Sequence, residues 1–323
     1  MTTGLKDLLR ERLSLLSETG SRLQPEHLLD RDAPGGLRPP DFRSANRHCR
    51  LLQAREGWIA LNLARPDDRD MVPALVGDEV KGDLWEAVSQ TARYEDAVSF
   101  RDRAVELQLP VAIVGEVSST ALKNIDACRV PRRVIDMSAL WAGPLCAGLL
   151  ARCGAEVIRV ESPNRPDPTR LGSPMLNRFL NGNKKHIALD LGTDAGLSAL
   201  HELIRSADVL VTSARPAALS GLGITPELLM ERAPGLVWLA ITAHGQEGQG
   251  GNRVGFGDDC AAAGGLVDYV EAQPHFRGDA LADPLTGLEG ALAVLDACGR
   301  ERTGLVDIAM SRVASGYAIG VQS

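Results

Sequence analysis

The stretch VIDMSALWAGPLCAGLLARCGAEVIRVE, residues 134–161, decides which fold the chain is expected to adopt. It opens with a short β-branched run, VIDMS, continues with a helical segment over residues 143–153, and closes with a second β-branched run, EVIRVE. A strand, a crossover helix and a second strand form the unit from which parallel sheets are built. The stretch therefore predicts one βαβ unit.

The same alternation continues after residue 161. The β-branched runs HIALDL (186–191), VLVTS (209–213) and LVWLAIT (236–242) alternate with helical segments at 197–206 and 226–232. This pattern is typical of an α/β fold, and we predict a Rossmann-like, doubly wound parallel sheet. Ligands of such sheets bind beyond the carboxyl ends of the strands. The expected positions of a site are therefore the loops after Ser138, Glu161, Ser213 and Thr242.

The part of the chain before residue 129 shows a different pattern. Residues 1 to about 24 are expected to form an amphipathic helix, and DRDAPGGLRPP (30–40) has the proline, glycine and charge of a linker. A mixed segment follows, with predicted strands at 57–63 and 110–114 and helical periodicity around 84–88 and 97–107. We divide the chain into an N-terminal helix and linker (1–40), a smaller α/β domain (41–128) and a large Rossmann-like domain (129–323).

The composition argues against several classes of protein. The net charge is −7, whereas nucleic-acid and anionic membrane partners select for a basic surface, so we expect neither partner. The apolar runs are too short to span a bilayer, and the first residues lack the apolar core of a signal peptide. The six cysteines form no CxxC pair. We therefore expect reduced thiols in the cytoplasm, without a disulfide framework or a metal site.

A nicotinamide cofactor is only weakly indicated. Gly143 and Gly148 of the first strand–helix turn do not have the GxGxxG spacing of dinucleotide-binding proteins. Glu161 ends the second strand, where such proteins keep an acid for the ribose, but a glutamate at a strand end is more often simply solvated. HGQEGQGGNRVGFG (244–257) contains six glycines. The glycines could let the backbone approach a ligand closely or let the segment move as a lid. The alternative is a mobile surface loop.

Asp283 is the sharpest single feature of the sequence. In ALADPLTGLEGALAVLDA it stands before Pro284 and a long helical pattern, so we expect Asp283 at the N-cap and Pro284 at the first helical position. A carboxylate there is held ionised by the helix dipole, and an ionised carboxylate can attack a thioester. The residues alone leave both functions open and favour the plain cap.

Basic residues are expected at the ligand edge of the sheet. They are Arg159, Arg165, Arg170, Lys184, Lys185 and Arg215. They could hold the phosphates of a nucleotide, or they could be solvated surface cations.

The order of these segments resembles the large domain of the family III CoA-transferases, also called the CaiB/BaiF family. The resemblance rests on residues 134–163, LNGNKKHIALDL, ADVLVTSARPAAL, ALADPLTGLEGALAVLDA and ERTGLVDIAM, and it extends to about Gly316. It implies that Asp283 is the nucleophile, and that coenzyme A is a substrate rather than a tightly bound cofactor. The residues it assigns to the acyl-CoA path are Leu140, Trp141, Ala142, Arg159, Lys184, Lys185, Leu189, Ser213, Arg215, Ala218 and Phe256. Trp141, beside the expected thioester, hints at an apolar acyl group.

The chain departs from the family pattern at three places. Where family racemases carry a histidine in a GHD-like element, this chain has Gly255, Phe256 and Gly257, which cannot titrate. Asp258 or Asp259 could compensate for the lost polar groups. Ser162 and Gly221 replace residues that the family uses for the CoA nucleotide.

Residues 49–117 resemble the small domain of the family, which normally follows the large domain. The chain therefore looks permuted. The resemblance implies an interlocked homodimer, or a heteromer with a paralogue, acting on acyl-CoA and a small carboxylic acid. Two alternatives stay open: an acyl-CoA racemase, isomerase or lyase, and a non-catalytic CoA-binding subunit.

Overall fold

A six-stranded parallel sheet forms the centre of the molecule. The computed structural model describes residues 3–16, 22–33 and 35–322. The strand order is β11-β8-β7-β4-β5-β6, and every neighbouring pair is parallel. The strands are β4 (Arg133–Asp136), β5 (Glu156–Glu161), β6 (Lys185–Ala188), β7 (Val209–Thr212), β8 (Val237–Thr242) and β11 (Gly304–Ala309). The order reverses at β4, so the prediction of a Rossmann-like, doubly wound sheet is confirmed.

Helices cover both faces of this sheet because successive strand residues point to opposite sides. Val134 belongs to the core under one set of helices and Ile135 to the core under the other. The first set is α7 (Ala142–Arg152), α9 (Pro174–Asn181), α14 (Ala282–Gly299) and α15 (Met310–Gln322). The second set is α10 (Asp194–Arg205), α11 (Pro216–Ser220) and α12 (Pro226–Arg232). The short α8 (Thr169–Gly172) precedes α9.

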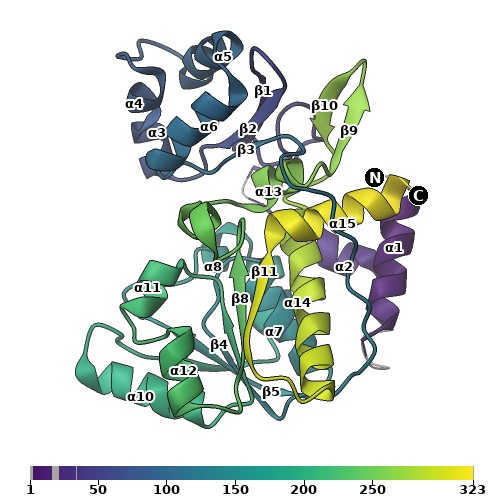
Figure 1. Ribbon diagram of the computed structural model, residues 1–323, viewed down its shortest axis with the longest axis vertical. Helices are drawn as coiled ribbons and strands as arrows, with labels where there is room; N and C mark the ends of the chain where they lie inside the picture. The colour runs from purple at the N-terminus through teal and green to yellow at the C-terminus, as the bar shows by residue number, and fades with distance from the viewer. Residues whose placement is uncertain (1–2, 17–21, 34, 323) are drawn as a thin grey trace.

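The N-terminal segment packs on the large core. Helix α1 (Thr3–Ser14) lies along α15, and the two ends of the chain are close together (Figure 1). Arg12 of α1 donates to both carboxylate oxygens of Glu289 at 2.9 and 2.5 Å, and the Tyr317 hydroxyl donates to the same carboxylate at 2.9 Å. Helix α2 (Pro25–Leu29) follows, with Leu28 and Leu29 buried. Residues 17–21 of the expected first helix lie outside the described residues.

A second, smaller sheet is antiparallel and has the order β1-β2-β3. Its strands are β1 (Cys49–Gln53), β2 (Trp58–Asn62) and β3 (Val111–Ile113). Helices α3 (Pro66–Asp70), α4 (Val72–Val76), α5 (Leu84–Tyr94) and α6 (Ala97–Glu106) cover one face of it. The predicted strands at 57–63 and 110–114 correspond to β2 and β3.

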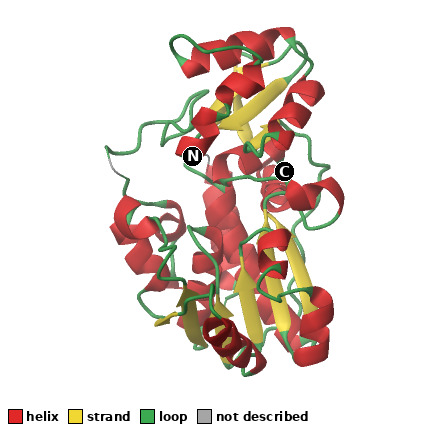
Figure 2. Ribbon diagram, turned by 90° about the vertical axis from the view of Figure 1, so that its left-hand side faces the viewer, coloured by secondary structure: helices red, strands yellow, loops and turns green. Residues whose placement is uncertain are grey.

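The other face of the small sheet rests on the large domain. Ala60 of β2 packs with Ala262 of α13 (Gly257–Ala263) and with Phe276 of the hairpin β9 (Val267–Val270) and β10 (Gln273–Phe276). Figure 2 shows the two sheets as separate layers with helices between them. Helix α13 and the β9–β10 hairpin are therefore elements through which the small sheet contacts the large domain. No helix in the described part of the chain combines the length and apolarity that a membrane span requires.

Candidate functional site

Asp283 lies in the first turn of α14, two positions further into the helix than expected from the sequence. The helix begins at Ala282 with Leu281 at the N-cap, so Asp283 is the second helical residue and Pro284 the third. The expectation of an Asp283 cap and Pro284 at the first position is wrong, because Leu281 already has helical dihedrals and Asp283 N–H donates to Ala280 O at 2.9 Å. Pro284 is tolerated because N–H groups of the first turn have no intrahelical acceptor. The Asp283 carboxylate is consequently not used as a cap.

The Asp283 carboxylate approaches the backbone of Gly257 closely. A Cβ atom at position 257 would lie 2.3 Å from Asp283 Oδ2 and 2.3 Å from Ala280 O, so only glycine fits there. Gly257 begins α13 and Ala142 begins α7. The first residues of three helices thus meet around one carboxylate, with backbone N–H groups available to it.

The ionisation of Asp283 is finely balanced. Burial raises the pKa of the Asp283 carboxyl to about 7, and the negative charge of Asp279 adds to the rise. The positive charge of Arg31 and the N–H groups of Gly257 and Ala142 act in the opposite direction. The side chain retains some solvent exposure. A carboxylate with this pKa is nucleophilic in about half of the molecules at neutral pH.

Arg31 brings the N-terminal segment to Asp283. Its Nε and Nη2 donate to Asp279 Oδ2 and Oδ1 at 2.5 and 2.8 Å, and its guanidinium lies 5.2 Å from the centroid of the Trp141 ring. Sequence reasoning missed this residue because it lies in the stretch interpreted as a linker. Its partners are about 250 residues away, and no local pattern marks such a contact.

Asp258 and Asp259 lie in the first turn of α13, and their carboxylates accept hydrogen bonds from nearby backbone N–H groups. Asp258 accepts hydrogen bonds from Ala280 N–H at 2.8 Å and from Asn46 Nδ2 at 3.3 Å. Asp259 accepts from Phe256 N–H at 3.0 Å and from Asn62 Nδ2 at 3.3 Å. Burial raises the pKa of Asp258 to about 7 and that of Asp259 to about 8.

The predicted residues after β4 also lie beside Asp283. Trp141 is buried, and its Nε1 has no hydrogen-bond partner within the described residues. Leu140 is 37% exposed and has a φ of 68°, with its N–H donating to Asp167 Oδ2 at 3.1 Å. Of these three residues, Ala142 reaches the predicted nucleophile through its backbone N–H, and Trp141 contacts Arg31.

Other predicted residues lie along the carboxyl edge of the sheet. Ser213 follows β7, and its Oγ accepts from Ala139 N–H at 3.0 Å. Arg215 is exposed and donates to Gln108 Oε1 at 2.5 Å. Half-buried Leu189 follows β6, exposed Ala218 lies on α11, and half-buried Phe256 lies 5.8 Å from the Arg65 guanidinium.

Lys184 and Arg159 do not present their charge to a ligand, contrary to the sequence expectation. The Lys184 ammonium donates to Asp136 Oδ2 at 2.7 Å and to Pro144 O and Asn181 Oδ1 at 2.8 Å, which uses all three of its protons. Arg159 is 1% exposed and binds Asp136 at 3.3 Å. Both residues neutralise one buried carboxylate, so neither is free for a phosphate.

Lys185 is also unsuited to the predicted function. It is exposed, and its ammonium lies 2.5 Å from Glu156 Oε1. Glu156 is the first residue of β5, so the Lys185 charge is directed toward the start of that strand rather than its carboxyl end.

One group of side chains within the described residues has the geometry of a metal site. Ligand-type atoms of His244, Asp259 and Cys260 lie within 4.8 Å of one another. Burial raises the pKa of the Cys260 thiol well above its usual range, and both Asp259 oxygens already accept hydrogen bonds. The donor set therefore does not favour a cation.

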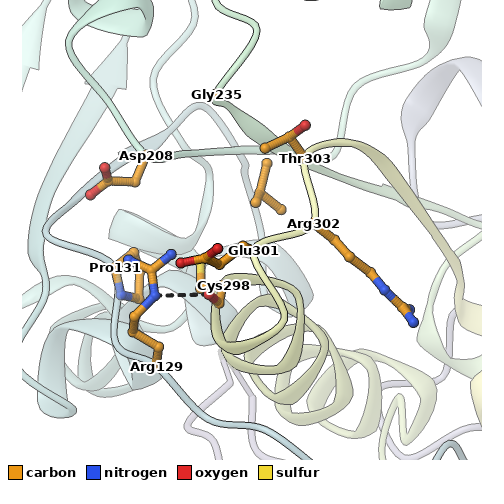
Figure 3. Close-up of a pocket in the computed structure, with 9 residues that line it drawn as sticks. Arg129, Pro131, Asp208, Gly235, Cys298, Glu301, Arg302 and Thr303 are labelled. Atoms are coloured by element: carbon orange, nitrogen blue, oxygen red, sulfur yellow. Dashed lines mark hydrogen bonds between the residues drawn. The ribbon is translucent and has the colours of Figure 1, made fainter.

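Two cavities lie apart from Asp283. One of about 160 Å³ is at the amino ends of the strands, where Arg129 Nε donates to Cys298 O at 2.8 Å (Figure 3). Another of about 770 Å³ lies next to the glycine-rich loop and includes His244. Asp283 lines neither of these two cavities.

Comparison with known proteins identifies relatives of the large domain. Residues 132–318, more than half of the chain, match the model of CoA-transferase family III. The chain is 34% identical over 190 residues to succinyl-CoA–D-citramalate CoA-transferase of Chloroflexus aurantiacus, covering 54% of this chain and 47% of that protein. It is 35% identical over 185 residues to the succinyl-CoA–L-malate CoA-transferase beta subunit of the same organism, covering 53% and 45%.

A solved structure shows the same fold. A CaiB/BaiF family protein from Brucella suis aligns with a TM-score of 0.52 and 26% identity, covering 59% of this chain and 55% of that one. The chain spans about half the length of the curated relatives that it matches.

Proposed function

The chain belongs to CoA-transferase family III, and from this premise we propose that it transfers coenzyme A from an acyl-CoA to a carboxylic acid through Asp283. The observation that carries the proposal is the Asp283 carboxylate at the start of α14, against Gly257 and beside the start of α7. A carboxylate nucleophile must be ionised to attack, and the charge of Arg31 with the N–H groups of Gly257 and Ala142 favours the ionised form of Asp283 against the effect of burial.

The proposed reaction has four steps. Asp283 attacks the thioester carbonyl of the donor, the carbon–sulfur bond breaks, and a mixed anhydride and CoA thiolate form. The thiolate attacks the Asp283 carbonyl, which releases the donor acid and leaves an aspartyl-CoA thioester. The acceptor carboxylate attacks this thioester and expels the thiolate. The thiolate then attacks the acceptor carbonyl, which releases the new acyl-CoA and restores the Asp283 carboxylate.

The surrounding groups have separate functions in this scheme. Arg31 counters Asp279 and keeps part of Asp283 ionised, since its charge lowers the pKa of that carboxyl. The N–H groups of Gly257 and Ala142 are placed to stabilise the oxyanion that forms on the Asp283 carbonyl oxygen when the CoA thiolate attacks it. Coenzyme A acts as a substrate, and no tightly bound cofactor is required by these steps.

The identity of donor and acceptor is proposed from the relatives. Two of them are named for succinyl-CoA as donor and for hydroxy acids as acceptors. We propose succinyl-CoA as the first donor to test and a small carboxylic acid as acceptor. The acyl-CoA path would run along the carboxyl edge from Leu189 and Arg215 to Trp141.

The assembly is also part of the proposal. One relative is named as a beta subunit, which supports a heteromer with a paralogue as an alternative to a homodimer. The free cysteines support the expected cytoplasmic location of the protein.

The oligomeric state is measured directly by size-exclusion chromatography with light scattering on the purified chain.

Intact-protein mass spectrometry tests the central step. After incubation with succinyl-CoA, we expect a covalent CoA adduct on the wild-type chain and none on Asp283→Asn. Asp194→Asn is the matched control, because Asp194 is also in the first turn of a helix but is exposed on α10. An adduct that survives in Asp283→Asn would refute the assignment. Exchange of the α-proton with deuterated water without an acceptor acid would instead identify a racemase or isomerase.

A further inference from the structure

The cavity of about 770 Å³ is built from four separate segments. It lies between α6 of the small domain, residues 116–120, the glycine-rich loop 244–253 and the first turn of α15. Its volume is that of a small-molecule site. Ser311 and Arg312 line it from the start of α15, where the helix dipole favours negative charge.

Three polar atoms of the lining residues are buried without a partner. They are His244 Nε2, Arg253 Nε and Ser311 Oγ. The described part of the chain has nine such side-chain atoms, and one third of them therefore belong to this cavity. Ser311 is 1% exposed, so its hydroxyl cannot turn to bulk water. Buried polar atoms are rarely left unpaired, which indicates that a ligand group completes them.

Arg312 is the one cation of the cavity lining that no described carboxylate neutralises, although the lining holds four carboxylates and three arginines. Arg312 is exposed and forms no ion pair among the residues that the structure describes, whereas Arg253 and Arg101 each bind Glu116, at 2.5 and 3.0 Å. Burial, with the charges of Arg253 and Arg101, lowers the pKa of His244 to about 3. His244 is therefore neutral at physiological pH and has one N–H to donate.

The acidic residues of the rim limit the charge of this anion. Asp102, Glu106 and Glu247 also line the cavity, and their negative charges would repel a phosphate with two charges more strongly than a carboxylate. We propose that this cavity is a second binding site, specific for a small carboxylic acid in its ionised form, with the carboxylate received by Arg312, Ser311 and His244.

This site is separate from the nucleophile. Asp283 is not among the residues that line the cavity. Binding of the acid does not involve a covalent step. The inference is therefore independent of the proposed CoA transfer.

Isothermal titration calorimetry on the full chain, with succinate and inorganic phosphate as probes, tests the proposal. We expect one saturable succinate site, with Arg312→Gln weakening it about tenfold and Ser311→Ala weakening it several-fold, since each loses a hydrogen bond to an anion. Arg302→Gln is the matched control, because Arg302 lines the other cavity, of about 160 Å³, at the amino ends of the strands (Figure 3). Arg302→Gln and Asp283→Asn should bind succinate as the wild type does, and phosphate should bind at least about tenfold more weakly.

Several results would overturn the proposal. They are the absence of saturable heat with succinate, unchanged affinity in both Arg312→Gln and Ser311→Ala, and phosphate binding as tight as succinate binding. Loss of binding in Asp283→Asn would place the acid at the nucleophile instead. Circular dichroism of each variant verifies its fold, and Ser311→Ala removes a single oxygen atom, so at least one variant stays interpretable if Arg312→Gln unfolds.

Discussion

Replacing Arg31 by glutamine should change the pH at which Asp283 becomes reactive. Arg31 is the largest influence that lowers the pKa of Asp283, which burial raises to about 7. It also neutralises Asp279 through hydrogen bonds of 2.5 and 2.8 Å. Without Arg31, the ionised form of Asp283 loses a favourable interaction with a positive charge, and the charge of Asp279 is no longer neutralised. Both changes raise the pKa of Asp283. The pKa of the nucleophile must therefore rise.

The size of this effect follows from the charge that is removed. A nearby opposite charge commonly lowers the pKa of a carboxyl group by about 1–3 units. The Asp283 pKa is thus expected at about 8 or above in Arg31→Gln. The ionised fraction at pH 7 would fall from about one half to about one tenth or less. Formation of the CoA adduct at pH 7 should slow about fivefold or more and should recover at about pH 9.

The assay is a rapid-quench time course of adduct formation, read by intact-protein mass spectrometry over a range of pH. Arg31→Lys is the matched control, since it keeps the positive charge and should retain most of the wild-type pH profile. A profile in Arg31→Gln that overlays the wild type would refute the electrostatic argument. A loss of equal size at every pH would show that Arg31 acts only through structure.

Three further changes have expected outcomes that the structure fixes. Gly257→Ala should slow adduct formation by at least about a hundredfold, because its Cβ would lie 2.3 Å from Asp283 Oδ2 and must displace the nucleophile. Lys184→Met should lower the free energy of unfolding by about 3 kcal/mol, measured by urea denaturation, because it removes a cation from fully buried Asp136. The raised pKa of Asp259, about 8, means that the folded protein holds a proton that the unfolded chain has released, so this contribution to stability is present at low pH and is lost as the pH rises toward 8. The asparagine of Asp259→Asn cannot titrate. When the pH is raised from about 6 to 8, the free energy of unfolding of the wild type should therefore fall by about 2 kcal/mol more than that of Asp259→Asn.

Each of these changes has a control within the chain. Gly172→Ala meets no atom within 4 Å and should leave adduct formation unchanged. Lys185→Met removes an exposed lysine and should change the free energy of unfolding by less than about 1 kcal/mol. Asp194→Asn, at an exposed site, should keep the wild-type pH dependence. Equal effects in a variant and its control would contradict the corresponding reasoning.

The sequence predicted the features that local patterns encode. The alternation of β-branched and helical segments was sufficient for the parallel sheet, since each crossover is a local unit. The position of Asp283 at a helix start followed from the same kind of pattern. Its place within the first turn was misassigned by two positions, because the preference of proline for the first helical position is statistical.

Features that depend on distant partners could not be predicted. Lys184 looks like a surface lysine in NGNKKH, and only the folded chain shows that it faces Asp136, 48 positions earlier. Arg31 was missed for the same reason: its partner, Asp279, is 248 positions away. A single sequence carries no signal for such pairs.

Helix α13 connects the small sheet to the predicted nucleophile. Its first residue touches the nucleophile, while its side supports the small sheet, and Asn62 of β2 is hydrogen-bonded to Asp259 at 3.3 Å. A rotation of the small sheet would move helix α13 and its first residue, Gly257. The backbone N–H of Gly257 would then lie further from Asp283. Displacement of the small sheet would then lower the reactivity of the Asp283 thioester at the same time. The aspartyl intermediate would therefore be less susceptible to hydrolysis while the small sheet is displaced.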